Sequence, residues 1–211
     1  MFTISVEKMR EADQYTINKG TSSKELMRRA AQGVFDIYPG WAGSKTLIVC
    51  GSGNNGGDGY ALAAILKKEN MDVTVLRLSE KFSEDGKFYY DRCAELGVPF
   101  LMYENDEVVF ESYQVIVDCI LGTGFSGTPR DPIPAVINGI NYARAAYGVF
   151  VISVDINSGM NGDTGEGETA VESDLTVSIG FYKTGFFQGK APKLISNLAN
   201  VDIGIELPDQ E

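Results

Sequence analysis

Hydrophobic residues along the chain form short continuous runs, and between the runs they recur every three or four positions. The runs are apolar at successive positions, which is typical of parallel strands buried on both faces. We predict strands at Thr46–Cys50, Val73–Leu78, Phe100–Tyr103, Val115–Leu121, Val149–Ile156 and Leu175–Ile179, with one or two edge strands within Leu194–Ile205. We predict helices at Ser5–Lys19, from Ser22 or Ser23 to Ile37, and at Asp58–Glu69, Ser83–Leu96 and Pro132–Ala146.

This alternation of strands and helices predicts an α/β fold, in which helices cover both faces of a mostly parallel, doubly wound sheet. The expected architecture is a three-layer αβα sandwich. A length of 211 residues suits one domain, and no linker, internal repeat or low-complexity segment divides the chain. We therefore expect a single domain over residues 1–211.

The composition limits the partners and the cellular location that we expect for this protein. The net charge of −11 argues against nucleic acid or an anionic membrane as a partner. No apolar run reaches the roughly 18 residues that span a bilayer, and the segment from Met1 to Arg10 is polar, so we expect a cytoplasmic protein. Cys50, Cys93 and Cys119 are expected to be reduced, buried thiols.

The chain has no histidine, which restricts its chemistry. Serine or cysteine catalysis through an imidazole is excluded, and so is zinc held by histidine. Any acid–base step must use Asp, Glu, Lys, Tyr or Cys. Any bound metal is expected to have oxygen ligands, which suits hard cations.

Polar, glycine-rich segments follow three of the predicted strands. Gly51–Gly59 follows the first strand, Gly122–Thr128 follows the strand that carries Asp118, and Asn157-Ser158-Gly159 follows the strand that carries Asp155. Parallel strands end at the same edge of a sheet, and in the usual doubly wound order the first and fourth strands are neighbours. Ligands bind in the crevice between them, so we expect the three segments to line one site.

The aspartates in these segments also have structural explanations. Asp118 and Asp155 lie inside apolar runs, where a carboxylate is costly unless it is paired, hydrogen-bonded or bound to a metal. We interpret the pair as functional, while a purely structural role stays open. We expect Asp58 to cap the helix that we place at Asp58–Glu69.

The glycine-rich segments match known nucleotide-binding patterns only in part. The start of Gly51–Gly59 fits G-x-G-x-x-G, but the next strand ends at Leu76–Ser79 without the acidic residue that binds ribose hydroxyls. Asp58 would also stand near the helix N-terminus that faces a pyrophosphate, and its charge would repel that group. A P-loop is excluded because no Gly-Lys-Ser/Thr follows. The better phosphate cradle is Gly122–Thr128, with Arg130 nearby.

Five segments together carry a family resemblance. They are Glu25-Leu26-Met27, Cys50–Gly59, Val117–Arg130, Val154–Gly165 and Thr176–Gly185, the last with Lys183 in a T-x-x-x-G-x-x-K-x-G pattern. Through them the chain resembles the NAD(P)H-hydrate epimerase family, also called the YjeF amino-terminal domain family. The resemblance implies a Rossmann-like domain that interconverts the R and S forms of hydrated NADH and NADPH. These hydrates carry a hydroxyl at C6 of the reduced nicotinamide.

The resemblance also implies roles for individual residues. Contacts to the dinucleotide are implied for Asn54, Asn55, Gly56, Gly57, Asp58, Gly122, Thr123, Gly124, Phe125, Ser126, Gly127, Thr128 and Asp155. A potassium ion is implied at Asn55, Asp118 and Ser158. Neutral oxygens with one carboxylate suit a weakly held, hard cation, whose expected role is to organise the loops.

Epimerisation must break and remake a bond at C6. The hydroxyl could leave and return as water, or the ring could open reversibly. Both routes need a general acid–base near the hydroxyl. In the absence of histidine we expect Asp155 to be the catalytic residue, with Asp58 and Lys183 as second choices.

Two positions depart from the family pattern. Arg28 stands where an acidic residue usually follows Leu-Met, and Asn157 replaces the proline of Asp-Ile-Pro-Ser-Gly. The first departure lies in the N-terminal helices, which in this family are associated with subunit contact. It weakens the expectation of a homodimer, whereas the second leaves the functional side chains of its loop in place.

The resemblance also implies a partner enzyme, and two alternative functions stay open. Many bacterial members are fused to a dehydratase domain, which this chain is too short to include, so we expect a separate NAD(P)H-hydrate dehydratase. One alternative function is a non-catalytic nucleotide-binding or scaffold module that uses the same pocket, and another is a nicotinamide oxidoreductase. The presence of Asn55, Asp118, Asp155 and Ser158 together favours the isomerase.

Overall fold

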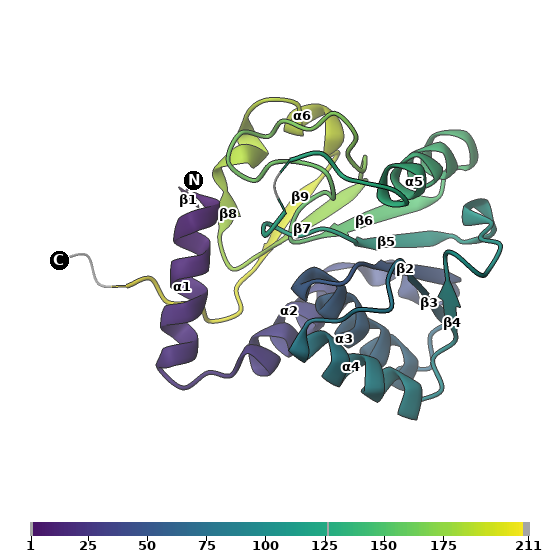
Figure 1. The fold of residues 1–211 in the computed structure, drawn as a ribbon, viewed down its shortest axis with the longest axis horizontal. Helices are drawn as coiled ribbons and strands as arrows, with labels where there is room; N and C mark the ends of the chain where they lie inside the picture. The colour runs from purple at the N-terminus through teal and green to yellow at the C-terminus, as the bar shows by residue number, and fades with distance from the viewer. Residues whose placement is uncertain (1, 126, 209–211) are drawn as a thin grey trace.

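The computed structural model describes residues 2–125 and 127–208. Its centre is a 7-stranded parallel sheet with the order β4-β3-β2-β5-β6-β7-β9 (Figure 1). The strands are β2 (Thr46–Cys50), β3 (Val73–Arg77), β4 (Phe100–Met102), β5 (Val115–Cys119), β6 (Phe150–Val154), β7 (Leu175–Ile179) and β9 (Leu198–Val201). The predicted α/β fold with a doubly wound sheet is confirmed.

Helices cover both faces of the sheet, as the continuous apolar runs predicted. The helices after the first are α2 (Ser23–Ile37), α3 (Asn54–Lys68), α4 (Glu84–Glu95), α5 (Ile133–Tyr147) and the short α6 (Ala191–Leu194), with 3₁₀ turns at Pro39–Trp41, Phe110–Ser112 and Thr184–Phe187. In β2, Ile48 and Cys50 join the core formed with α2, α3 and α4, whereas Leu47 and Val49 join the core formed with α5. All four side chains are fully buried, so the sheet is the middle layer.

Serine side chains fix where several helices begin. Ser22 accepts a hydrogen bond from the Glu25 N–H (3.2 Å), and Ser83 accepts one from the Gly86 N–H (3.1 Å). Each cap satisfies one of the backbone donors that the first turn of a helix leaves free. The predicted starts of α2 and α4 therefore agree closely with the structure.

The start of α3 differs from the prediction. We expected the helix to begin at Asp58, but it begins at Asn54, with Gly53 at the N-cap. Asp58 therefore lies inside the helix and does not cap it. The polar, glycine-rich sequence resembles a loop, but the glycines allow the helical backbone to pack closely against the sheet and α4.

The strand order confirms the predicted position of the switch point, between β2 and β5. β2 lies between β3 and β5, and Cys50 is paired with Cys119 at the ends of β2 and β5. The chain leaves these two strands in opposite directions across the sheet, which opens a crevice between the loops. The loop after β6 follows immediately beside them.

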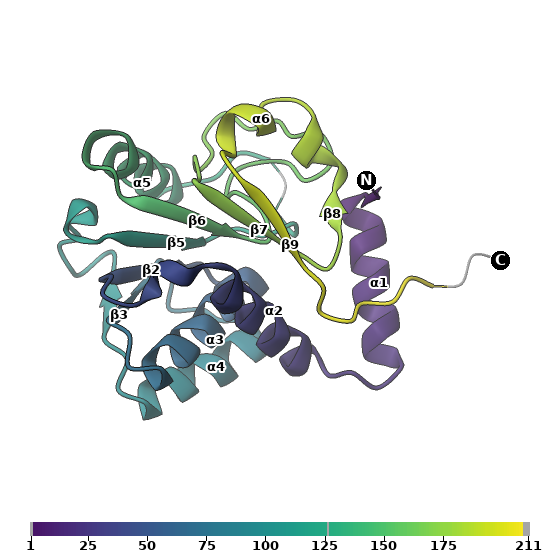
Figure 2. The same cartoon turned by 180° about the vertical axis from the view of Figure 1, so that it is seen from behind.

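The first helix, α1 (Val6–Asn18), stands apart from α2, α3 and α4, next to β8 (Figures 1 and 2). It is tied to the body at both ends. Before it, β1 (Thr3–Ile4) pairs in parallel with β8 (Tyr182–Lys183), and near its end Thr16 accepts a hydrogen bond from the Glu206 N–H (2.9 Å). None of the helices in residues 2–125 and 127–208 has the length and apolar character needed to cross a membrane.

Candidate functional site

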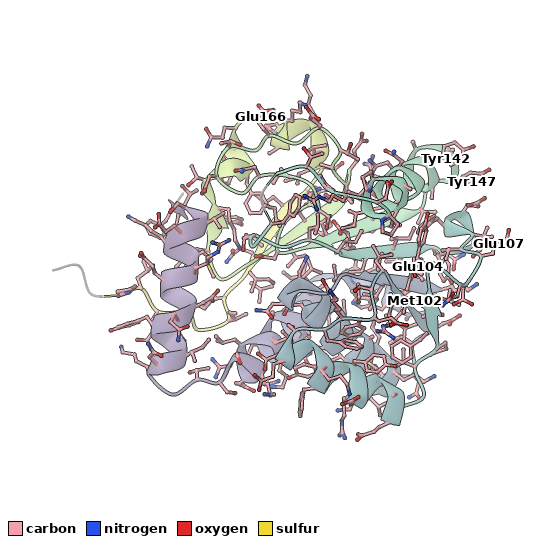
Figure 3. All side chains as sticks on the ribbon, in the orientation of Figure 1. Met102, Glu104, Glu107, Tyr142, Tyr147 and Glu166 are labelled. Atoms are coloured by element: carbon pink, nitrogen blue, oxygen red, sulfur yellow. The ribbon has the colours of Figure 1, made fainter. Side chains whose placement is uncertain are left out.

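A cavity of about 790 Å³ opens at the carboxyl edge of the sheet. The parts of the chain that line it include α1, α2, the loop from β2 into α3, the loop after β5, and the residue that follows β6. The exposed aromatic residues Tyr142 and Tyr147 of α5 lie on the opposite side of the molecule from α1, and Glu166 lies near α6 (Figure 3). The residues that line the cavity range from Met9 to Ile203, so segments far apart in the sequence build it.

The first turn of α3 supplies backbone donors at the cavity wall. Gly53 makes no side-chain cap, and the first helical hydrogen bond runs from the Gly57 N–H to the Gly53 carbonyl (3.2 Å). The N–H groups of Asn54 and Asn55 therefore have no partner within the helix. Together with the helix dipole they favour an anionic group at this point.

Two glycines of this turn lie beneath the wall. Gly56 and Gly57 are buried, and the cavity is lined by their neighbours Asn54, Asn55 and Asp58. A Cβ on Gly56 would overlap the Gly51 carbonyl oxygen, and one on Gly57 would come 3.2 Å from the Gly86 Cα of α4. These glycines allow the close packing that positions the first turn.

Asp118 is completely buried at the end of β5, and both of its carboxylate oxygens are satisfied. One oxygen accepts from the Ile120 N–H (3.2 Å) and from the Ser158 hydroxyl. The other accepts from the Ser158 N–H (2.9 Å) and the Ser153 hydroxyl (2.9 Å). Burial raises the pKa of Asp118, and these donors oppose that rise.

Asn55 and Ser158 meet around the peptide unit of Leu121. The Asn55 amide donates to the Leu121 carbonyl (2.9 Å), and the Leu121 N–H donates to the Ser158 hydroxyl (2.8 Å). The three residues that the resemblance implied for a cation are thus brought together, since Ser158 also binds Asp118. The Asn55 Oδ1 atom is buried and has no hydrogen-bond partner among the described residues. It is an oxygen available to a ligand.

Asp155 occupies an unusual backbone conformation directly after β6. Its φ is +67°, in the left-handed region that residues other than glycine seldom adopt. The only other described non-glycine residue with a positive φ is Asn70. Strained backbones cluster at functional sites, where the surrounding structure holds them in place. The side chain of Asp155 is 18% exposed and lines the cavity.

Lys183 lies behind Asp155. Its ammonium group forms an ion pair with Asp155 and donates to the Ile179 carbonyl (2.8 Å). The Lys183 side chain is 0% exposed, so the Asp155 carboxylate is accessible from the cavity and the Lys183 ammonium is not. Lys183 therefore positions and balances Asp155, and a direct role as an acid–base group, our second choice, is not what this placement favours.

Four further aspartates line the same cavity, and the pKa values of two of them are raised. Asp58 projects from α3, and Asp13 projects from α1. Burial, with the nearby charges of Asp155 and Asp13, raises the pKa of Asp58 well above its usual range. This raised pKa weakens the repulsion of a pyrophosphate that we expected from Asp58. Burial, followed by the charge of Asp155, raises the pKa of Asp13 to about 6.

Sequence reasoning missed Asp13. The residue lies four positions after Met9 and four before Ile17, both of which face inward from α1. A carboxylate on the apolar side of an amphipathic helix was the available clue. Its place in the site depends on the docking of α1, which local patterns do not predict.

The loop after β5 divides between two hollows. Gly122, Thr123, Gly124 and Phe125 line the main cavity. Gly127 and Thr128 line a neighbouring hollow of about 470 Å³, and Ser126 lies outside the described residues.

Arg10 connects α1 to this loop. Its guanidinium donates to the Thr123 carbonyl (3.2 Å) across the cavity. Among the described residues that line the cavity it is the one with a positive charge, beside Asp13, Asp58, Asp85, Asp131 and Asp155. It stands where an anionic ligand that reaches the loop would meet it.

Comparisons with known proteins agree on one family. The sequence profile of the family described as "YjeF-related protein N-terminus" matches residues 23–185. The NAD(P)H-hydrate epimerase of Oenococcus oeni is 34% identical over 218 residues, and the match covers 97% of this chain and 98% of that protein. The bifunctional NAD(P)H-hydrate repair enzyme Nnr of Coxiella burnetii is 33% identical, over 93% of this chain but 40% of that enzyme.

The fold is also found among solved structures. The crystal structure of yeast ynu0, YNL200c, aligns with a TM-score of 0.79 and 21% identity, and covers 100% of this chain and 97% of that chain. At this identity the likeness establishes the fold alone. The relatives thus include a protein of nearly equal length and one more than twice as long.

Proposed function

This chain belongs to the YjeF-related protein N-terminus family, and we propose that it is an NAD(P)H-hydrate epimerase, an isomerase acting on hydrated NADH and NADPH. The observation that carries the proposal is Asp155. Its carboxylate is held in a strained backbone conformation, with the buried ammonium of Lys183 behind it and the cavity in front. A fixed carboxylate at the floor of a dinucleotide-sized cavity is suited to acid–base chemistry.

We infer that the dinucleotide binds across the switch point. The free N–H groups at the start of α3 and the loop Gly122–Phe125 would hold the pyrophosphate. Arg10 would add a positive charge to that contact, which offsets the acidic lining of the cavity. With the pyrophosphate there, the hydrated nicotinamide would reach toward Asp155.

At the nicotinamide, Asp155 would exchange a proton with the hydroxyl at C6. Both the loss and return of water and the reversible opening of the ring need such a group. Lys183 would hold the carboxylate in one orientation through the exchange, because its ammonium is fixed by the Ile179 carbonyl as well.

We propose that Asn55, Asp118 and Ser158 hold a potassium ion. The support is the buried Asn55 Oδ1 without a partner, close to a serine hydroxyl and a buried carboxylate. Free acceptor capacity lies on Asn55 and Ser158, while Asp118 contributes the negative charge. Neutral oxygens with one charge suit a monovalent hard cation better than a transition metal. When bound, the ion would supply positive charge that orders α3 and the loops after β5 and β6.

The setting of the reaction follows from the same proposal. We propose that the protein acts in the cytoplasm, where the reduced nicotinamide cofactors are damaged, and that a separate dehydratase consumes the product. The bifunctional relatives, of which this chain spans about 40% of the length, are consistent with such pairing. A homodimer stays a prediction.

Conversion of a single epimer tests the proposal. The purified R hydrate of NADPH, incubated with the protein, is expected to give the S form until both are present, as followed by chromatography. The variant Asp155→Asn should lower the rate at least 100-fold. Asparagine is the suitable replacement because it tolerates a positive φ. Asp36→Asn, at an exposed aspartate of α2, is the matched control and should keep full activity.

Three results would contradict the proposed function or the role of Asp155 in it. A wild-type protein that binds the hydrate but leaves its configuration unchanged would be a binding module, the alternative function considered above. Hydride transfer from NADPH to an acceptor would indicate an oxidoreductase. Full activity of Asp155→Asn would remove Asp155 from the chemistry.

A further inference from the structure

Asp13 is a carboxyl group of the cavity that the proposed function has not used. It lies on α1, on a different wall from Asp155 after β6 and Asp58 on α3. In the part of the chain that the structure describes, it takes part in no hydrogen bond and no ion pair. The charge of Lys183 acts to lower the pKa of Asp13, but the Lys183 ammonium is paired with Asp155. Asp13 is thus a partly buried carboxyl group that lines the cavity and has no polar partner among the described residues.

The groups around Asp13 form a ligand-binding site and not only a cluster of acidic residues. The same cavity contains the Asn55 Oδ1 atom, which is buried and unpartnered. It also contains a carboxylate held by a buried cation, Asp155 with Lys183. Arg10, one helical turn before Asp13, is anchored to the loop after β5 at Thr123 (3.2 Å), which fixes α1 against the opposite wall.

We propose that Asp13 is a second catalytic residue, which works with Asp155 on the C6 hydroxyl from another wall of the cavity. This inference rests on the proposed epimerase function. Inversion at one carbon requires departure on one face of the ring and return on the other. A single side chain reaches one face, whereas two carboxyl groups, one on α1 and one directly after β6, can serve both.

In the water route, Asp13 and Asp155 together supply and take up the proton that the reaction needs. A carboxylic acid, Asp13, gives its proton to the C6 hydroxyl, the C–O bond breaks, and water leaves as the lone pair of the ring nitrogen forms a C=N bond. Water then adds to C6 on the other face, and Asp155 takes its proton as the nitrogen regains its lone pair. The proton has moved from Asp13 to Asp155, and solvent exchange in the open cavity restores it. The reverse reaction starts from the other carboxyl group.

Asp13 suits this cycle better than Asp58. Burial raises the pKa of Asp58 well above its usual range, which favours its protonated form over a carboxylate that can accept a proton. With a pKa raised to about 6, Asp13 is able to hold or release a proton near neutral pH. The charged groups that face it are Asp155, Asp58 and Lys183, with Arg10 on its own helix.

The test is the variant Asp13→Asn beside wild type, measured with both purified epimers from pH 5 to pH 8. We expect kcat to fall at least 100-fold while the Kd for the hydrate changes less than threefold. The pH dependence of the residual rate should lose the step near pH 6. Asp13→Glu keeps a carboxyl group and should recover part of the rate. Glu11→Gln removes the same charge from the exposed side of α1 and should leave activity and its pH profile unchanged.

Each other outcome overturns the inference. A rate for Asp13→Asn within threefold of an active wild type would show that epimerisation proceeds without Asp13 and would leave the proposed function intact. A loss of rate that comes entirely from weaker binding of the hydrate would make Asp13 a binding residue. An inactive wild type would overturn the proposed function, and this inference with it. Circular dichroism of each variant identifies any loss of fold.

Discussion

At the scale of single residues, the buried carboxyl groups are distinguished by how the protein satisfies them. Asp118 accepts hydrogen bonds at both oxygens from groups that the fold itself places, so its cost of burial is met by structure. Asp155 has a single buried cation and an open side. Asp13 has neither donor nor cation in the described residues. Of the three, the last two have the unused capacity that a substrate hydroxyl could occupy.

The raised pKa of Asp13 predicts how its removal affects stability. A carboxyl group with a pKa of 3.8 in the unfolded chain and about 6 in the folded protein binds more protons when folded between those values. Its favourable contribution is therefore complete below pH 3.8 and is lost as the pH rises through 6. Asp13→Asn should match wild type at pH 4 and gain about 1–3 kcal/mol in free energy of unfolding by pH 8.

Urea unfolding at a series of pH values measures this gain. Glu11→Gln, which changes the same formal charge at an exposed position, should show no such rise. Parallel curves for Asp13→Asn and wild type across the whole range would mean that Asp13 is not desolvated as described.

At the scale of elements, the sequence predicted the sheet well because its strands are continuous apolar runs, and these depend on burial alone. It also predicted that Asn55, Asp118 and Ser158 meet, since each lies at or soon after the carboxyl end of a parallel strand. It did not predict where α3 begins, because Asn and Gly favour loops unless close packing compensates. Nor did it place Asp13, because α1 reaches the cavity through contacts with residues near 182 and 206.

The packing of α3 against the sheet predicts which glycine is least replaceable. A Cβ on Gly59 would lie 2.7 Å from the Cys50 sulfur and 2.9 Å from the Cys119 Cβ, both fully buried. Gly59→Ala is expected to lower the free energy of unfolding by about 1–3 kcal/mol, because neither strand can move away. Denaturant titration measures the loss.

A matched substitution separates packing from the general effect of replacing glycine. A Cβ on Gly124 would meet no atom within 4 Å, and the backbone there does not have a positive φ. Gly124→Ala should therefore change the free energy of unfolding by less than about 0.5 kcal/mol. Equal effects of the two substitutions would mean that α3 is not tightly seated on β2 and β5.

At the scale of the whole molecule, a strongly acidic protein has to bind a substrate that is itself an anion. The net charge is −11, and the described lining of the cavity has five aspartates against one arginine. Helix N-termini, the arginine and the raised pKa values of Asp13 and Asp58 reduce this repulsion locally. A cation bound between α3 and the loops after β5 and β6 would reduce it further and would join parts of the molecule that the sheet alone leaves separate.

Thermal unfolding in different salts tests the cation. At equal ionic strength, potassium should raise the Tm above its value in tetramethylammonium, which is too large for such a site. If potassium is present at ten times its Kd, linkage gives about 1.4 kcal/mol, or about 3–6 °C for a chain of this size. Asn55→Ala, which removes the unpartnered oxygen, should abolish the difference, and the same Tm of wild type in both salts would argue against the site.

The pairing of β1 with β8 has a consequence for biosynthesis. Thr3 and Ile4 are translated well before their partners Tyr182 and Lys183, which lie far along the sequence. Until then the amino-terminal helix has no place to dock, and the carboxylate after β6 has no lysine. A nascent chain can complete most of its sheet and still be inert, so the onset of turnover reports the translation of the segment that carries β8.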